Sequence, residues 1–171
     1  MRILAAIGAL AIIIGLLAGG YFLGGFYNVA AATDDAAPVD WLLTRVRSAS
    51  IARRAAGQAP FSVDDPAQIQ DGARKYAQYG CTHCHGAPGA EWSKVSEGLN
   101  PGPPDLKEIA GERDISSIFW VVKNGIRMTG MPSFGKAGVP DNDLWQIAAF
   151  VKKLPVVSEG DYKNWTASSS H

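Results

Sequence analysis

Two cysteines and a histidine at residues 81–85 carry the clearest chemical signal in the sequence. Cys81, Cys84 and His85 stand in the order C-x-x-C-H, and the chain has no further cysteine. Two thiols three residues apart on one helical turn can each form a thioether to one of the two vinyl groups of a porphyrin. The histidine that follows can then lie under the iron as an axial ligand. The motif therefore predicts one covalently attached haem c, with its iron bound by His85.

Two other kinds of site also use closely spaced cysteines. A thioredoxin-like redox pair precedes a helix in a βαβ unit, and no strand-rich pattern surrounds residues 81–85. A zinc site takes four ligands. Once both cysteines are used, the remaining soft donors of the chain are its histidines: His83, His85 and His171. Haem attachment is the interpretation that uses every residue of the motif.

The first 32 residues predict a membrane anchor. From Ile3 to Val29 the chain has no charged residue, which exceeds the roughly 20 residues that cross a bilayer and the about 7–15 of a cleavable signal. The end of this run is rich in aromatic residues typical of a membrane interface: Tyr21, Phe22, Phe26 and Tyr27. A removed signal is the alternative, because Ala30-Ala31-Ala32 offers a cleavage site before Thr33. We expect a retained transmembrane helix within residues 1–32.

Residues 33–63 predict a juxtamembrane linker with a short basic helix. Asp40 can cap a helix from Trp41 to about Ala56, and this helix contains four arginines: Arg45, Arg47, Arg53 and Arg54. Such a helix suits anionic headgroups or a partner subunit, and a solvated helix is the alternative. Even as flexible coil, some thirty residues span only about 30 Å. We therefore expect the following domain to stay near the membrane.

Residues 64–155 predict a domain of three helices joined by irregular loops. Capping residues and apolar periodicity mark the helices, and a Pro/Gly-rich stretch over 86–111 contains no convincing element. Residues 156–171 predict a polar C-terminal tail. The three expected helices begin after Asp65, Asp114 and Asp141, and they end at Gly80, Asn124 and Leu154.

Several residues give this domain a family resemblance. Gly72 and Tyr76 lie four apart in the first helix, and the loop after the haem motif reads Pro103-Pro104-Asp105-Leu106. The last helix has an aromatic and apolar face: Trp145, Phe150 and Val151. These features resemble a class I c-type cytochrome with a single Met/His-ligated haem. The resemblance implies an all-α cytochrome c fold with three core helices around the haem. It also implies that the Pro104 carbonyl accepts a hydrogen bond from Nδ1 of His85.

The second axial ligand has two candidates in the segment 126–135, which glycines and proline keep out of regular helix. These candidates are Met128 and Met131. In the family that the domain resembles, the ligand is a methionine followed by proline, which selects Met131 and leaves Met128 as the alternative. The other possible donors are badly placed for the far side of the haem: His83, His171 and Met1.

The resemblance implies an electron carrier and not an enzyme, because iron with two axial ligands has no open position for a substrate. Thioether attachment implies export, which places the haem domain in the periplasm, although the arginines of residues 45–54 oppose this orientation under the positive-inside rule. The expected partners are membrane-bound or periplasmic redox proteins of a respiratory chain. Lys+Arg and Asp+Glu are both 16, so nothing in the overall charge points to nucleic acid.

Two alternative functions stay open at this stage. The chain is either a free carrier or a fixed electron-transfer subunit of an exported dehydrogenase or respiratory complex, which shares the same haem chemistry. The second alternative is a haem-based gas sensor, which requires that Met131 dissociate from the iron. The sequence offers no distal His and Arg pair suited to peroxide cleavage.

Overall fold

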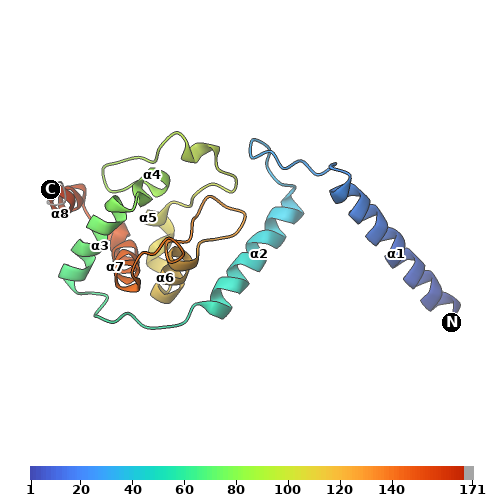
Figure 1. The fold of residues 1–171 in the computed structure, drawn as a ribbon, viewed down its shortest axis with the longest axis horizontal. Coiled ribbons are helices and arrows are strands. Elements are labelled where there is room, and N and C mark those ends of the chain that lie inside the picture. The colour runs from blue at the N-terminus through green and yellow to red at the C-terminus, as the bar shows by residue number, and fades with distance from the viewer. Residues whose placement is uncertain (168–171) are drawn as a thin grey trace. The chain divides into compact units, whose positions relative to one another are not determined.

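A single apolar helix, α1 (Arg2–Leu23), makes up most of the first of the two units into which the chain divides, Met1–Asp34 and the remainder. The computed structural model describes residues 1–167 (Figure 1). At 1.5 Å per residue, α1 is about 33 Å long, close to the about 30 Å of a bilayer core. Its mean hydropathy reaches 2.5 and none of it is buried. By length and composition, α1 can cross a membrane.

Aromatic residues from the last turn of α1 and from the segment directly after it pack together. The helix ends where the amide of Gly24 donates to the carbonyl of Gly20 and the amide of Gly25 donates to the carbonyl of Phe22. The rings of Tyr21 and Phe26 then stack with their centroids 6.4 Å apart, and those of Phe22 and Tyr27 lie 5.2 Å apart. The expected aromatic cluster is therefore a set of touching rings at one end of α1.

The second unit is helical, which confirms the predicted all-α fold. Residues 1–167 contain no β-strand, only an isolated bridge between Ala87 and Ala90. The α-helices of this unit are α2 (Ala37–Arg54), α3 (Pro66–Gln78), α4 (Cys81–His85), α5 (Leu106–Ile109), α6 (Ile115–Asn124), α7 (Asp141–Lys153) and α8 (Glu159–Ala167). Single 3₁₀ turns lie at η1 (Ser96–Gly98), η2 (Ala110–Glu112) and η3 (Leu154–Val156).

Two of the expected helix caps are present in the structure. The Asp65 carboxylate accepts a hydrogen bond from the amide of Ala67 at 2.9 Å, and Asp114 accepts one from Ser116 at 3.2 Å. Each side chain satisfies an amide that has no partner within its own helix. Gly125 ends α6 with a φ of 67°, a conformation that favours glycine.

The expected caps Asp40 and Asp141 are wrong. Helix α2 begins at Ala37, with Pro38 in its first turn, so Asp40 lies inside the helix. The φ angle of proline is already helical, which lets the helix start earlier than the acidic residue suggests. Helix α7 is capped by Pro140, and Asp141 instead forms an ion pair with Lys123 at 2.6 Å.

The core of the second unit is the crossing of α3 and α7 (Figure 1). The backbones approach closely at Gly72, where an added Cβ would meet the carbonyl of Gln146 and the side chain of Phe150. Next to this contact, the rings of Tyr76 and Phe150 lie 5.2 Å apart. Both rings are at most 1% exposed. A side chain at position 72 would therefore separate the two helices.

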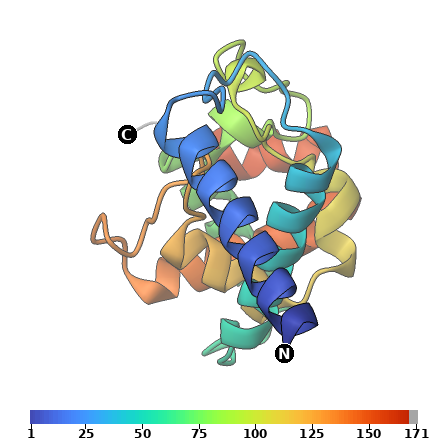
Figure 2. The ribbon, with the colours of Figure 1, turned by 90° about the vertical axis from the view of Figure 1, so that its right-hand side faces the viewer.

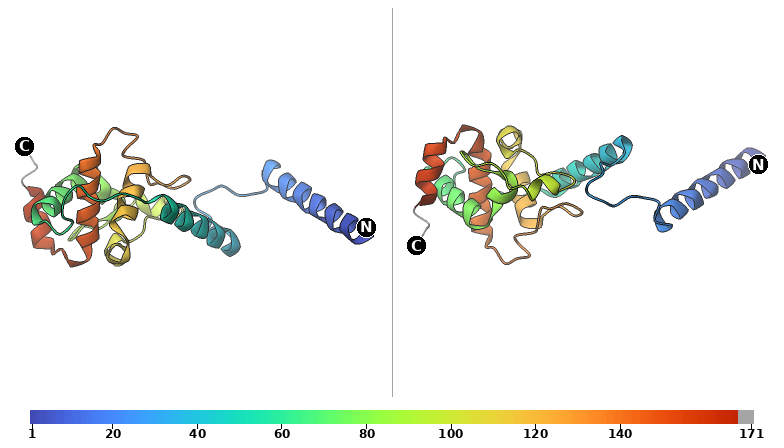
Figure 3. Two further views of the ribbon diagram at one scale, coloured as in Figure 1. Left: turned by 90° about the horizontal axis from the view of Figure 1, so that it is seen from below. Right: turned by 90° about the horizontal axis from the view of Figure 1, so that it is seen from above.

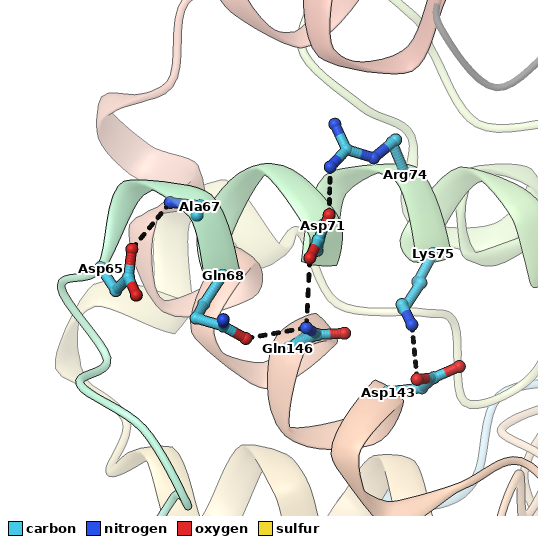
Figure 4. A network of polar contacts seen from close by, with 8 residues as sticks. All are labelled: Asp65, Ala67, Gln68, Asp71, Arg74, Lys75, Asp143 and Gln146. Carbon is cyan, nitrogen blue, oxygen red and sulfur yellow. Dashed lines mark hydrogen bonds and ion pairs between the residues drawn. The ribbon is translucent and has the colours of Figure 1, made fainter.

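Polar side chains join the same two helices at the edge of the crossing (Figure 4). Lys75 on α3 forms an ion pair with Asp143 on α7 at 2.5 Å. The amide nitrogen of Gln146 donates to Gln68 at 2.7 Å and to Asp71 at 3.4 Å. These contacts fix the register of α7 along α3, because each pairs a side chain of one helix with a defined position of the other.

Helix α6 packs on the other side of α7. The rings of Phe119 and Trp145 are nearly parallel, with centroids 3.9 Å apart and an interplanar angle of 3°. Residues 144–151 of α7 are all buried, because α3 covers one side of this helix and α6 another. The three core helices expected from the sequence are thus α3, α6 and α7.

The expected tail over residues 156–171 is wrong for its described part. Residues 159–167 form α8, which lies beside α3 (Figure 3). Tyr162 is 8% exposed and its ring stacks on Phe150 with centroids 5.8 Å apart. Trp165, one turn later, also packs against the core. Two aromatic residues three apart share one helical face, and burying that face stabilises a segment whose composition is otherwise polar.

Candidate haem site

The attachment motif occupies α4, a single turn that follows α3 directly. Gly80 precedes it in the left-handed conformation, with a φ of 77°, and Gly86 follows it with a φ of 63°. The Tyr76 hydroxyl donates a buried hydrogen bond of 2.9 Å to the Gly86 carbonyl. Both ends of the turn are therefore fixed, and Cys81, Cys84 and His85 come from five consecutive residues of one rigid segment.

His85 contacts Pro104, the proline whose carbonyl the family resemblance implies as its partner. Nδ1 of His85 lies 3.2 Å from the carbonyl oxygen of Pro104. A carbonyl only accepts, so Nδ1 is the protonated nitrogen and Nε2 keeps its lone pair. Burial lowers the pKa of His85, while the bond to Pro104 opposes that change. The neutral imidazole is thus favoured, which is the form that binds a metal ion.

The two thiols differ in their surroundings. Burial raises the pKa of Cys81 to about 12, so its thiol stays protonated at neutral pH. Cys81 packs against the apolar core, and neither cysteine forms a disulfide. The tyrosines Tyr76 and Tyr162 lie near enough to Cys81 for their own pKa values to be raised, mainly by burial and further by this thiol.

Met131 lies in the irregular loop between α6 and α7 (Figure 2). The loop closes on itself, because the amide of Ile126 donates to the carbonyl of Met131 at 3.2 Å. The Thr129 hydroxyl donates to the Ile126 carbonyl at 2.8 Å and accepts from the Met131 amide at 3.1 Å. Met131 is partly buried against the core cluster, whereas Met128 is 84% exposed.

The loop after α4 and the methionine loop also touch. An added Cβ at Gly130 would lie 2.7 Å from the side chain of Leu99, so these two segments pack together at that point. This contact is not evident from the sequence, because Leu99 lies in a Pro/Gly-rich stretch without a regular apolar pattern. The glycine leaves room for a leucine from the loop that follows α4.

Of the other possible donors, only His83 belongs to the described part of the second unit. The His83 ring is exposed, with Nδ1 3.1 Å from the carbonyl of Gly80. Met1 belongs to the first unit, and His171 lies outside the described residues. Among residues 1–167, no three His, Cys, Asp or Glu side chains are grouped to hold a metal ion. The zinc alternative therefore lacks its set of ligands in this part of the chain.

The residues present fit a covalently attached haem. The thiols of Cys81 and Cys84 are free to form thioethers, and Nε2 of His85 is the available nitrogen of an imidazole oriented by Pro104. Partly buried apolar side chains from separate segments of the domain pack against its core: Leu106, Ile118, Met131 and Phe134.

Comparison with known proteins supports the same conclusion. The family model described as "Cytochrome C oxidase, cbb3-type, subunit III" matches residues 67–151. Residues 67–151 are a cytochrome c domain of this family. The matched range begins in α3 and ends in α7, so the cytochrome c domain includes α4, Pro104 and the methionine loop. No curated protein and no solved structure matches the chain. Helices α1, α2 and α8 lie outside the match.

Proposed function

We propose that the chain is a one-electron carrier on the outer face of a membrane. Its cytochrome c domain holds one haem c through Cys81 and Cys84, with His85 and Met131 as the axial ligands of the iron. The contact of 3.2 Å between His85 and the Pro104 carbonyl carries this proposal, because it orients the imidazole that follows the two cysteines. Metal-ligating histidines commonly donate their second nitrogen to a carbonyl in this way.

The bound haem supplies exchange of one electron between ferrous and ferric iron. The bond from His85 to Pro104 makes the imidazole a stronger ligand. The thioether of Met131 favours the ferrous form and raises the reduction potential relative to a second histidine. Apolar side chains around the site act in the same direction, because they disfavour the additional positive charge of the ferric state.

The proposal keeps α1 as a retained anchor, with the cytochrome c domain in the periplasm. Thioether attachment to haem c is expected on that side. The arginines of α2 argue only weakly against a periplasmic position of the domain, because Arg45 comes 45 − 23 = 22 residues after the end of α1 at Leu23. The positive-inside rule applies mainly within about 15–20 residues of a span.

The ligation is tested by the optical spectrum of the ascorbate-reduced protein before and after carbon monoxide. We expect a low-spin spectrum that carbon monoxide leaves unchanged, since Met131 closes the sixth position. In Met131→Ala we expect full conversion to the carbonyl complex and a lower reduction potential. Met128→Ala is the matched control and should behave as the unchanged protein, because this exposed side chain is not a ligand.

A rapid and complete carbonyl shift in the unchanged protein would contradict the carrier and support the haem-based gas sensor. If Met128→Ala and not Met131→Ala opens the iron, then the ligand is Met128. The two substituted residues are three positions apart in one loop. A general loosening of this loop should therefore open the iron to carbon monoxide in both variants.

A fixed subunit of a respiratory complex is the second candidate, and the description of the matching family favours it. Both candidates share the haem site and differ in whether the partner is permanent. Mild detergent extraction followed by size-exclusion chromatography separates them. Migration of the haem-stained chain by itself supports the free carrier, and migration with other cytochrome c oxidase subunits in fixed proportion supports the subunit.

A further inference from the structure

Helix α2 has an apolar face that the second unit leaves uncovered. Helix α2 exposes four large apolar side chains, and at 100° per residue three of them lie within an arc of about 140°: Trp41, Leu42 and Val46, which are 62%, 54% and 58% exposed. The fourth, Leu43, is 46% exposed and lies beside this arc. The side chains that face the remainder of the unit are partly buried, and they include Thr44, Arg47 and Ile51. The contact of α2 with α6 therefore uses the opposite side of the helix.

Two arginines lie within the same arc as the apolar side chains. Arg45 and Arg53 make no hydrogen bond or ion pair with any residue that the structure describes. The other two arginines lie on the far side and bond within the helix: Arg47 to Thr44 at 3.5 Å, and Arg54 to the Ser50 hydroxyl at 2.9 Å. With four arginines and one acidic residue, Asp40, α2 carries a net charge of 4 − 1 = +3.

The distance along the chain limits what this face can meet. Residues 24–36, which are 36 − 24 + 1 = 13 residues, separate the end of α1 from the start of α2. A flexible segment of this length spans about 20 Å at the root mean square and about 45 Å when fully extended. If α1 lies in a bilayer, the first turns of α2 are held within reach of its surface.

We propose that the outer face of α2, defined by Trp41, Leu42, Arg45, Val46 and Arg53, lies on the anionic surface of the membrane that holds α1. The proposal rests on the anchoring of α1 under the proposed function. Tryptophan prefers the membrane interface, and exposed arginines are attracted to anionic headgroups. A helix in the membrane interface buries its apolar side chains at the boundary of headgroups and acyl chains, and long arginine side chains next to them can reach up to the headgroups. The cytochrome c domain is then attached at two points, which restricts its rotation relative to the membrane.

The test uses the full haem-loaded chain in lipid nanodiscs, with Val46→Cys carrying an environment-sensitive fluorophore. The haem-bonded cysteines do not react with the label. In nanodiscs containing phosphatidylglycerol, we expect blue-shifted emission and quenching by lipids that carry a nitroxide near the headgroup. A label at Lys94→Cys is the control, because this side chain is 91% exposed on the loop between α4 and η1, and its emission should be that of a fully hydrated fluorophore.

Matched pairs of substitutions test the assigned face. Replacing Arg45 and Arg53 by Gln should abolish most of the blue shift, with about a fivefold loss of the docked state per arginine. Replacing Arg47 and Arg54 by Gln removes the same charge from the other side and should have a smaller effect. Equal effects of the two pairs would overturn the assignment to the outer face.

Other outcomes separate this proposal from the anchor. If the chain is retained in nanodiscs but the label at position 46 shows the emission of a hydrated fluorophore, the docking of α2 is overturned and the anchor is supported. A blue shift without lipid quenching means that protein covers the face, as a partner subunit or a second copy, and it also overturns the proposal. A chain that is not retained in nanodiscs overturns both the anchor and the docking.

Discussion

Among single residues, Tyr76 ties the attachment segment to the core. Its hydroxyl donates to the Gly86 carbonyl directly after His85, and the ring packs on Phe150. In Tyr76→Phe the carbonyl loses this buried donor. We expect the free energy of unfolding to fall by about 1–3 kcal/mol, because an unsatisfied buried acceptor costs that much. Urea denaturation of the haem-loaded protein measures it.

Tyr162→Phe is the matched control for this prediction. Tyr162 packs on the same Phe150 ring, and its buried hydroxyl has no hydrogen-bond partner among the described residues. Removing it loses no hydrogen bond, so we expect an unchanged or slightly higher free energy of unfolding. Equal losses in the two variants would contradict this role of Tyr76, because only Tyr76→Phe removes a hydrogen bond while both variants keep the ring.

Among the helices, the crossing of α3 and α7 depends on the absence of a side chain at position 72. In Gly72→Ala the new methyl group meets the carbonyl of Gln146 and the side chain of Phe150. We expect a loss of about 1–3 kcal/mol despite the better helix propensity of alanine, because the packed helices must shift. Thermal unfolding followed by circular dichroism measures the loss.

The control for the crossing is Gly160→Ala in α8, where an added Cβ lies 3.9 Å from its nearest neighbour, the Ser158 hydroxyl. Here only helix propensity acts, and we expect a result between no change and a gain of about 1 kcal/mol. A gain at position 72 as well would mean that α3 and α7 can separate slightly at no cost.

For the chain as a whole, the fate of residues 1–32 decides whether the protein is anchored. We expect the haem-stained chain to stay in carbonate-washed membranes with an intact mass that includes these residues, since α1 is longer than the apolar core of a cleavable signal. Mass spectrometry of the membrane fraction measures this. A chain that begins at Thr33 and appears in the soluble fraction would instead identify residues 1–32 as a removed signal.

Features that depend on neighbouring residues could be predicted from the sequence. The haem motif, the caps of α3 and α6 and the end of α6 at Gly125 each involve residues within one or two turns of each other. The chemistry of such short segments is set by residue type and spacing. The pairing of His85 with Pro104 required the family resemblance as well, because Pro104 lies 19 positions after His85.

Features that depend on distant partners required the tertiary structure. The polar composition of α8 hides a helix that is stabilised by packing of Tyr162 on Phe150. The contact of Leu99 with Gly130 and the uncovered face of α2 also depend on which segments meet. Residue type and spacing determined what the motif can bind. The position of α8 and the exposed side of α2 depend on which helices pack together, which only the tertiary structure shows. The free energy of burying surface between two helices depends on both of them, so the sequence of either one alone does not determine it.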